Sequence, residues 1–142
     1  MKISIGNDHA GFLHKAAVLR FLEANGHQIN NYGTDTDSSV DYPDFVHPVA
    51  QDIVNGSAEK GILLCGSGNG VSITANKYKD IRAAICWEVV LAELARAHNN
   101  ANVLCIPARF VNEAVVLEMI DAFLNTSFEG GRHQKRVAKM CI

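Results

Sequence analysis

Short segments typical of β-strands alternate with longer segments of helical type along the whole chain. Such alternation predicts βαβ units, whose right-handed crossovers bring the strands together in a parallel sheet. We therefore expect an α/β fold, a three-layer Rossmann-like sandwich in which helices flank a five-stranded parallel sheet. The predicted strands are 2–6, 28–31, 61–65, 81–85 and 102–106, and the predicted helices are 11–25, 42–55, 70–77, 88–98, 112–125 and 131–140.

The first predicted helix shows the pattern on which these assignments rest. Leu13, Ala17 and Phe21 recur at a spacing of four residues and mark its apolar face, and Val18 and Leu22 lie on the adjoining flank. Apolar residues at that spacing line one side of an α-helix. This side is expected to pack against the sheet.

Length and composition predict one domain over residues 1–142, with 48% hydrophobic and 20% charged residues. The net charge of −2 argues against general binding to nucleic acid but leaves room for a local basic site. No apolar run approaches the roughly 20 residues of a membrane span, and the first residues are too short a stretch for a signal peptide. Cys65, Cys86, Cys105 and Cys141 form no C-x-x-C pair, so a paired-cysteine zinc site is not expected. A reduced, cytoplasmic protein is the simplest prediction.

A glycine loop follows the third predicted strand. Cys65 ends that strand, and Gly66, Gly68 and Gly70 come after it. Ligands of α/β folds bind at the carboxyl ends of the strands, and glycines let backbone amides approach an anion or oxyanion closely. The loop therefore indicates anion binding beside a thiol, with a tight strand-to-helix turn around a buried cysteine as the alternative.

The spacing of this loop excludes three common nucleotide or phosphate motifs. A dinucleotide fingerprint needs G-x-G-x-x-G after the first strand, whereas this loop follows the third strand and has Val71 in place of the last glycine. A P-loop needs a lysine, which Gly70-Val71-Ser72 lacks, and the thiol phosphatase pattern C-x5-R needs an arginine at position 71. What remains is a group of amides at a helix N-terminus.

Ionisable side chains stand at the ends of two further elements. Asp8 and His9 follow the first predicted strand and would therefore reach the same end of the sheet as Cys65, although capping of the next helix explains Asp8 equally well. His98 and Asn99 close the fourth predicted helix, where both residue types are also common for structural reasons.

Four cations share one face of the last predicted helix: Arg132, Lys135, Arg136 and Lys139. Like charges four residues apart repel by roughly a few tenths of a kcal/mol, and only Glu129 lies near them in the sequence. Guanidinium groups match the oxygens of a phosphate. The stripe indicates anion binding, with a solvated basic face as the alternative.

Seven short blocks, in order along the chain, carry a resemblance to one known family. The blocks are Gly6-Asn7-Asp8-His9-Ala10-Gly11, Asp41-Tyr42-Pro43, Cys65-Gly66-Ser67-Gly68-Asn69-Gly70, Ala75-Asn76-Lys77, Ile81-Arg82-Ala83, His98-Asn99 and Glu129-Gly130-Gly131-Arg132-His133. Together they resemble the type B ribose-5-phosphate isomerases nearly from end to end.

That resemblance implies an aldose–ketose isomerase that interconverts ribose 5-phosphate and ribulose 5-phosphate through an enediolate, within the pentose phosphate pathway of carbohydrate metabolism. It implies no metal and no cofactor. The expected partners are a small-molecule sugar phosphate and a second copy of the chain, with no nucleic acid and no membrane. The oligomer is a homodimer with shared active sites, or a tetramer built from two dimers. The C-terminal helix, 131–141, is expected to contact the partner subunit and to place its arginines in the neighbouring crevice.

The resemblance also implies roles for individual residues. Cys65 is the base that moves a proton between C1 and C2, and the loop amides stabilise its thiolate. Ser67 and the amides hold the enediolate oxygen, His98 opens the sugar ring, and Asp8 assists at the sugar hydroxyls. The implied catalytic residues are Cys65, His98, Ser67 and Asp8; the implied substrate-binding residues are Asp8, His9, Tyr42, Gly66, Ser67, Gly68, Asn69, Gly70, Asn99, Arg109, Arg132 and Arg136, of which His9, Arg109, Arg132 and Arg136 take the phosphate.

Some members of that family place a glutamate on the helix after the glycine loop. Here Ser72-Ile73-Thr74 carries no carboxylate, which leaves Cys65 as the local candidate for the base. Two alternatives remain. One is the same chemistry on a six-carbon substrate, such as allose or galactose 6-phosphate. The other is a nucleotide-binding module of the universal-stress type, which has an α/β layout and a glycine loop but leaves Cys65 and the arginines without a role.

Overall fold

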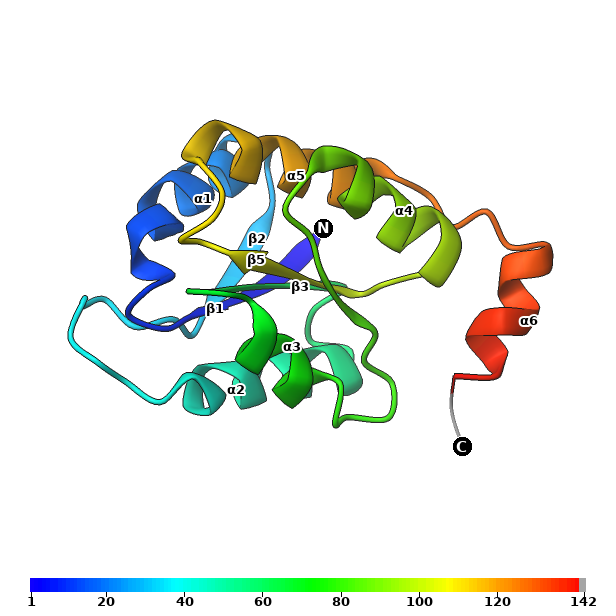
Figure 1. Ribbon diagram of the computed structural model, residues 1–142, viewed down its shortest axis with the longest axis horizontal. Helices are drawn as coiled ribbons and strands as arrows, with labels where there is room; N and C mark the ends of the chain where they lie inside the picture. The colour runs from blue at the N-terminus through cyan, green and yellow to red at the C-terminus, as the bar shows by residue number, and fades with distance from the viewer. Residues whose placement is uncertain (141–142) are drawn as a thin grey trace.

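The computed structural model describes residues 1–140, which form an α/β fold of alternating strands and helices that ends in two consecutive helices (Figure 1). The strands are β1 (Lys2–Asn7), β2 (Gln28–Asn31), β3 (Lys60–Cys65), β4 (Ala83–Ile85) and β5 (Val103–Pro107). The helices are α1 (Phe12–Ala24), α2 (Tyr42–Val54), α3 (Asn69–Ala75), α4 (Val89–Asn99), α5 (Glu113–Asn125) and α6 (Arg132–Ala138). Helix α6 ends at Ala138, two residues before the predicted end at 140, and Cys141 lies outside the described residues.

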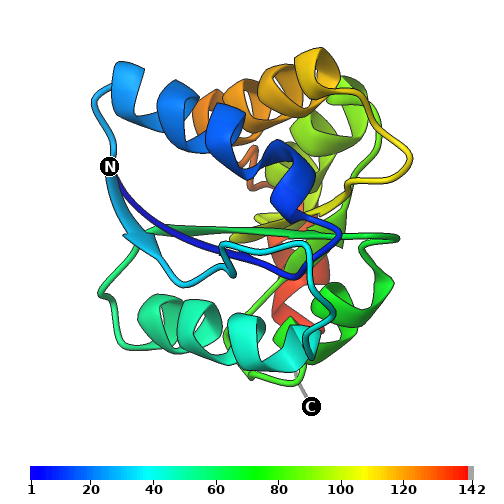
Figure 2. The same cartoon turned by 90° about the vertical axis from the view of Figure 1, so that its left-hand side faces the viewer.

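The five strands form one parallel sheet in the order β2-β1-β3-β5-β4. Helices α1, α4 and α5 cover one face, and α2 and α3 cover the other (Figures 1 and 2). Helix α6 stands away from these layers, beyond the end of α4 (Figure 1). The predicted three-layer sandwich around a five-stranded parallel sheet is confirmed.

Side chains alternate between the two faces of β3, as the period of a strand requires. Ile62 and Leu64 belong to the apolar core beneath α1, α4 and α5, whereas Leu63 and Cys65 belong to the core beneath α2 and α3. All four side chains are buried. Burial on both faces explains why this strand is a continuous apolar run rather than an alternating pattern.

Two elements differ from the sequence-based expectation. Leu13 of α1 is 71% exposed, and the buried side of this helix includes Ala17, Val18 and Leu22 instead. Strand β4 starts two residues later than predicted because the backbone of Ile81 bonds to a turn at Tyr78. None of the helices among the described residues has the length and apolar composition needed to cross a membrane.

The strand order creates a switch point between β1 and β3. The chain passes from β1 outward to β2 and then returns to place β3 on the other side of β1. A crevice at the carboxyl ends of the strands forms at such a point. Asn7, Cys65 and Pro107 stand at what we call the carboxyl end of the sheet, and the opposite end, where the strands begin, is the amino end.

Candidate active site

Asp8 lies at the switch point, directly after β1, and is 6% exposed. Its backbone amide donates to the carbonyl oxygen of Leu64 in β3, at 3.2 Å. One carboxylate oxygen, Oδ1, accepts from the amides of Ala10 and Gly11, each at 2.9 Å. The turn into α1 therefore fixes Asp8 against the end of β3, and one oxygen performs the capping role that the sequence left open.

The Cys65 thiol is held by the glycine loop that follows it. Sγ accepts a hydrogen bond from the amide of Gly68 at 3.2 Å, and the side chain is only 4% exposed. Gly68 has φ 78°, a left-handed conformation that suits glycine, and it is the residue before α3. The loop therefore turns its amides back toward the sulfur atom instead of continuing the strand direction.

The groups around this thiol shift its pKa in opposite directions. Burial raises the pKa of Cys65, the amides of Gly68 and Val71 lower it, the Asp8 carboxylate raises it and the Ser67 amide lowers it. The net direction is upward. The loop amides thus stabilise a thiolate as expected, but in the single chain they do not outweigh burial.

Three further predicted site residues lie at the same end of the sheet. A Cβ atom on Gly70 would lie 2.5 Å from Cζ of Tyr42, so the absence of a side chain there lets the tyrosine ring lie over the loop. His9 accepts at Nδ1 from the amide of Val40, at 3.2 Å. Ser67 is exposed, and its Oγ accepts from the amide of Asn69 at 3.3 Å.

Arg109 lies in the loop after β5 and reaches the glycine loop. Its backbone amide donates to the Gly66 carbonyl at 3.2 Å, and the amide of Ala108 donates to the Cys65 carbonyl at 2.8 Å. A Cβ on Gly66 would lie 3.0 Å from Nη1 of Arg109, so the guanidinium lies directly beside the glycine loop. The structure therefore brings an exposed cation next to the thiol loop, as the phosphate role of Arg109 requires.

Two buried polar residues of α1, which were not predicted from the sequence, hold the neighbouring loops. Nε2 of His14 lies 3.1 Å from the carbonyl of Ala108 and 3.0 Å from that of Val111, so this nitrogen carries the hydrogen and ties down the loop that carries Arg109. The ammonium of Lys15 makes three contacts of 2.7–3.1 Å that hold the loop before α2. The acceptors of Lys15 are the carbonyls of Gly33 and Thr34 and the carboxylate of Asp35.

The remaining predicted site residues lie at the amino end of the sheet. Helix α4 runs back from the carboxyl end and finishes at Asn99, just before β5 begins (Figure 1). His98 and Asn99 therefore stand far from the end at which Cys65 lies. Arg132 and Arg136 are exposed on α6, which projects beyond the amino end. One chain thus gathers Asp8, His9, Tyr42, residues 65–70 and Arg109 at one end, and His98, Asn99, Arg132 and Arg136 at the other.

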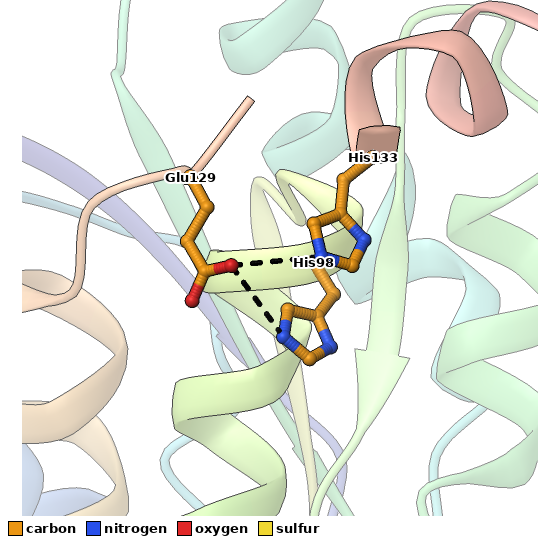
Figure 3. A group of neighbouring side chains, drawn as sticks. All are labelled: His98, Glu129 and His133. Carbon is orange, nitrogen blue, oxygen red and sulfur yellow. Dashed lines mark ion pairs between the residues drawn. The ribbon is translucent and has the colours of Figure 1, made fainter. Parts of the chain in front are cut away.

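His98 belongs to a compact cluster with Glu129 and His133 (Figure 3). Oε2 of Glu129 lies 3.8 Å from Nε2 of His98 and 3.5 Å from Nε2 of His133, and the two imidazole rings stack with centroids 4.1 Å apart. Burial lowers the pKa of His133, and the neighbouring charges of His98 and Arg132 lower it further. The Glu129 carboxylate raises it. A carboxylate therefore pairs with the imidazole to which the resemblance assigns ring opening.

A hollow of about 740 Å³ opens beside the site residues that lie at the amino end of the sheet. It lies between the loop before β4 and the end of the chain, and Arg82, Asn99 and Met140 are part of its wall. Cys65 does not line it. Asn99 consequently faces open space on the side of the molecule away from the thiol.

Comparisons with known proteins agree with the fold and with the resemblance seen in the sequence. The family model described as Ribose/Galactose Isomerase matches residues 3–140. The chain is 41% identical over 136 residues to ribose-5-phosphate isomerase B of Escherichia coli. The aligned region covers 96% of this chain and 91% of that protein.

Two solved structures extend the agreement to three dimensions. That of a ribose 5-phosphate isomerase from Thermotoga maritima has a TM-score of 0.96 and 46% identity, covering 99% of this chain and 97% of that one. That of ribose-5-phosphate isomerase B from Mycoplasma genitalium, with bound ribulose-5-phosphate, has a TM-score of 0.93 and 40% identity, covering 98% and 93%.

The chain therefore belongs to the Ribose/Galactose Isomerase family, and the resemblance given by the seven sequence blocks is confirmed. This family match favours an isomerase over the universal-stress alternative. Cys86 and Cys105, whose roles the sequence left open, are free and buried in the core. Burial raises the pKa of Cys86 to about 12 and also raises that of Cys105, so both thiols stay protonated.

Proposed function

We propose that this protein interconverts ribose 5-phosphate and ribulose 5-phosphate through an enediolate, with no metal in the mechanism. The observation that carries the proposal is the Cys65 thiol, bonded to the Gly68 amide and set beside Asp8 at the switch point of the sheet. Membership in the Ribose/Galactose Isomerase family supports the reaction type, and the ribulose-5-phosphate complex of the Mycoplasma genitalium relative supports the substrate.

In the proposed mechanism Cys65 removes the proton from C2 of the open sugar and returns it at C1. The negative charge that develops on the sugar oxygen is stabilised by the amides of the loop 66–70 and by the Ser67 hydroxyl. Asp8 accepts hydrogen bonds from sugar hydroxyls through the carboxylate oxygen that does not cap α1. Tyr42 and Asn69, at the mouth of the crevice, contact the bound sugar.

The proposed active site is shared between two copies of the chain. Because Cys65 and His98 lie at opposite ends of the sheet, the histidine that protonates the ring oxygen comes from a second copy, together with Asn99 for the open chain. Arg132 and Arg136 of that copy then join His9 and Arg109 of the first around the phosphate. A homodimer is the smallest assembly that completes such sites, and two dimers can pair into a tetramer.

The reaction belongs to the pentose phosphate pathway, and we infer that the protein works in the cytoplasm. Cys65, Cys86 and Cys105 are all free thiols. Unpaired cysteines are typical of proteins in reducing compartments.

The reaction is tested by incubating the purified protein with ribose 5-phosphate in D₂O, with allose 6-phosphate and galactose 6-phosphate in parallel. We expect ribulose 5-phosphate to form with deuterium at C1, because a proton held on a thiol exchanges with solvent before it returns. Addition of EDTA is expected to leave the rate undiminished. Turnover of only a six-carbon phosphate would show that ribose 5-phosphate is not the substrate. Turnover without any deuterium incorporation would contradict proton transfer through a base.

A further inference from the structure

We propose that His98, Glu129 and His133 form a binding site for Zn²⁺ at the amino end of the sheet. Each side chain offers one ligand atom, and the three atoms lie within 4.8 Å of one another. They come from three separate segments, namely the end of α4, the loop before α6 and α6 itself, and the Glu129 carboxylate lies beside both imidazole rings (Figure 3). Within residues 1–140, this is the one group of three such residues that is close enough to share an ion.

The separations of the ligand atoms suit a tetrahedral ion. Ligands about 2.0–2.1 Å from zinc at tetrahedral angles lie about 3.4 Å from one another. Glu129 Oε2 is 3.5 Å from Nε2 of His133 and 3.8 Å from Nε2 of His98. The two rings are stacked at an interplanar angle of 9°, so one of them has to rotate out of the stack before both lone pairs reach a common ion. The His98 side chain is 36% exposed and is the ring with room to do so.

The backbone holds the cluster together without a metal. The amide of Glu129 donates to the carbonyl of Ala97 at 3.0 Å, which fixes the glutamate next to His98. The amide of His133 donates to the carbonyl of Gly130 at 2.9 Å, and the His133 side chain is 5% exposed. The three side chains are therefore neighbours before a metal binds, and coordination requires only that one ring leave the stack.

The ligand set also selects the metal. Two imidazoles and one carboxylate are ligands of zinc and other late transition metals, whereas Mg²⁺ prefers oxygen ligands and retains its water. Three protein ligands leave a fourth position for water. The charges of Arg132 and Arg136 on α6 oppose a further cation, so we expect reversible binding that is weaker than in structural zinc sites.

Binding has a consequence for catalysis that rests on the proposed function. A metal on Nε2 of His98 excludes the doubly protonated imidazolium, the form that delivers a proton to the ring oxygen. Zn²⁺ is therefore an inhibitor of an isomerase that needs no metal. Removal of traces of zinc by a chelator would raise the rate rather than lower it.

The test is a calorimetric titration of the purified full chain with ZnCl₂ at pH 7, with MgCl₂ in parallel. We expect one Zn²⁺ per chain and no heat from Mg²⁺. Glu129→Gln changes a largely exposed side chain, so the variant keeps its fold, and it should weaken Zn²⁺ binding at least about 10-fold, a loss that even residues behind the metal ligands cause in natural sites. His133→Gln should act in the same direction, and circular dichroism reports whether its buried position still folds.

Two controls separate this site from other ligands. His47→Gln removes an exposed imidazole on α2 and should leave binding unchanged, and so should Cys65→Ala, which removes the candidate thiol at the carboxyl end. Absence of Zn²⁺ binding, binding that survives Glu129→Gln, or binding lost only in Cys65→Ala would overturn the proposal. The activity assay is independent: if Zn²⁺ binds at the cluster but ribose 5-phosphate is not turned over without it, the site stands and the proposed function fails.

Discussion

The two ends of the sheet carry different halves of the proposed active site, and they are built differently. At the carboxyl end, Asp8 and Cys65 are buried, stand on strand ends and are fixed by backbone hydrogen bonds. At the amino end, Arg132 and Arg136 are exposed on a short helix that projects from the molecule. Within residues 1–140, neither guanidinium group makes a hydrogen bond or an ion pair.

This contrast suggests which half performs chemistry and which half completes a neighbouring site. A base and an oxyanion site need preorganised geometry, which rigid strand ends supply. Cations that bind a phosphate at a subunit interface need reach instead, and a projecting helix supplies that. The same chain can therefore offer a fixed base at one end and an exposed set of binding groups at the other.

The largest effect is expected from removing the thiol at the carboxyl end. Cys65→Ala should lower kcat for ribose 5-phosphate by about 10²- to 10⁴-fold, the usual contribution of a general base. Cys105→Ala is the matched control, since it removes a buried thiol from the neighbouring strand and should leave turnover largely intact. Wild-type turnover by the Cys65→Ala variant would show that another residue is the base.

Removing an arginine at the amino end is expected to have a smaller effect, mainly on substrate binding. Arg136→Ala should raise KM about 10- to 100-fold with a smaller change in kcat, because it removes a charge-assisted hydrogen bond to the phosphate. Lys135→Ala, one position earlier on the same helix, should change KM much less. Equal effects from both variants would indicate a general charge effect rather than a placed arginine.

The pKa of Cys65 offers a finer test of the carboxyl end. Because this pKa is raised, the thiolate fraction should increase with pH until the thiol has ionised, and fall as the pH is lowered. Asp8→Asn removes a negative charge near the sulfur atom and keeps an oxygen to cap α1, so the pKa of Cys65 should move downward. The rate of alkylation by iodoacetamide against pH measures this without turnover, and an unchanged pKa would place Asp8 outside the electrostatic reach of the thiol.

The smallest effect is expected from the residue that supports Arg109. His14→Leu removes the hydrogen bonds to the carbonyls of Ala108 and Val111, and should lower the free energy of unfolding by about 1–2 kcal/mol. The loop that carries Arg109 loosens, so KM should rise a few-fold while kcat is nearly preserved. Leu13→Ala, at the exposed neighbouring position, should change neither quantity. An unaltered KM at normal stability would show that Arg109 does not need this support.

The sequence predicted the sheet, the helices and the glycine loop because each rests on local periodicity or on a glycine spacing. It did not predict that His14 and Lys15 are buried, although His14 precedes Val18 and Leu22 on one helical face, because their partners are carbonyls of loops distant in the sequence. The resemblance assigned Cys65 and His98 to one kind of site, and only the fold shows that within one chain they lie at opposite ends of the sheet. Whether a second copy unites them stays a prediction.

The claim of a shared site is tested most directly by a mixed oligomer of two inactive variants. Cys65→Ala and His98→Gln chains carrying different affinity tags are co-expressed, and oligomers that contain both are isolated by two successive purifications. Each mixed dimer has one site with both defects and one intact site, so about half of the wild-type activity should return. If the mixed oligomer is as inactive as its parents, Cys65 and His98 do not act together across two copies, and the account of a shared site is contradicted.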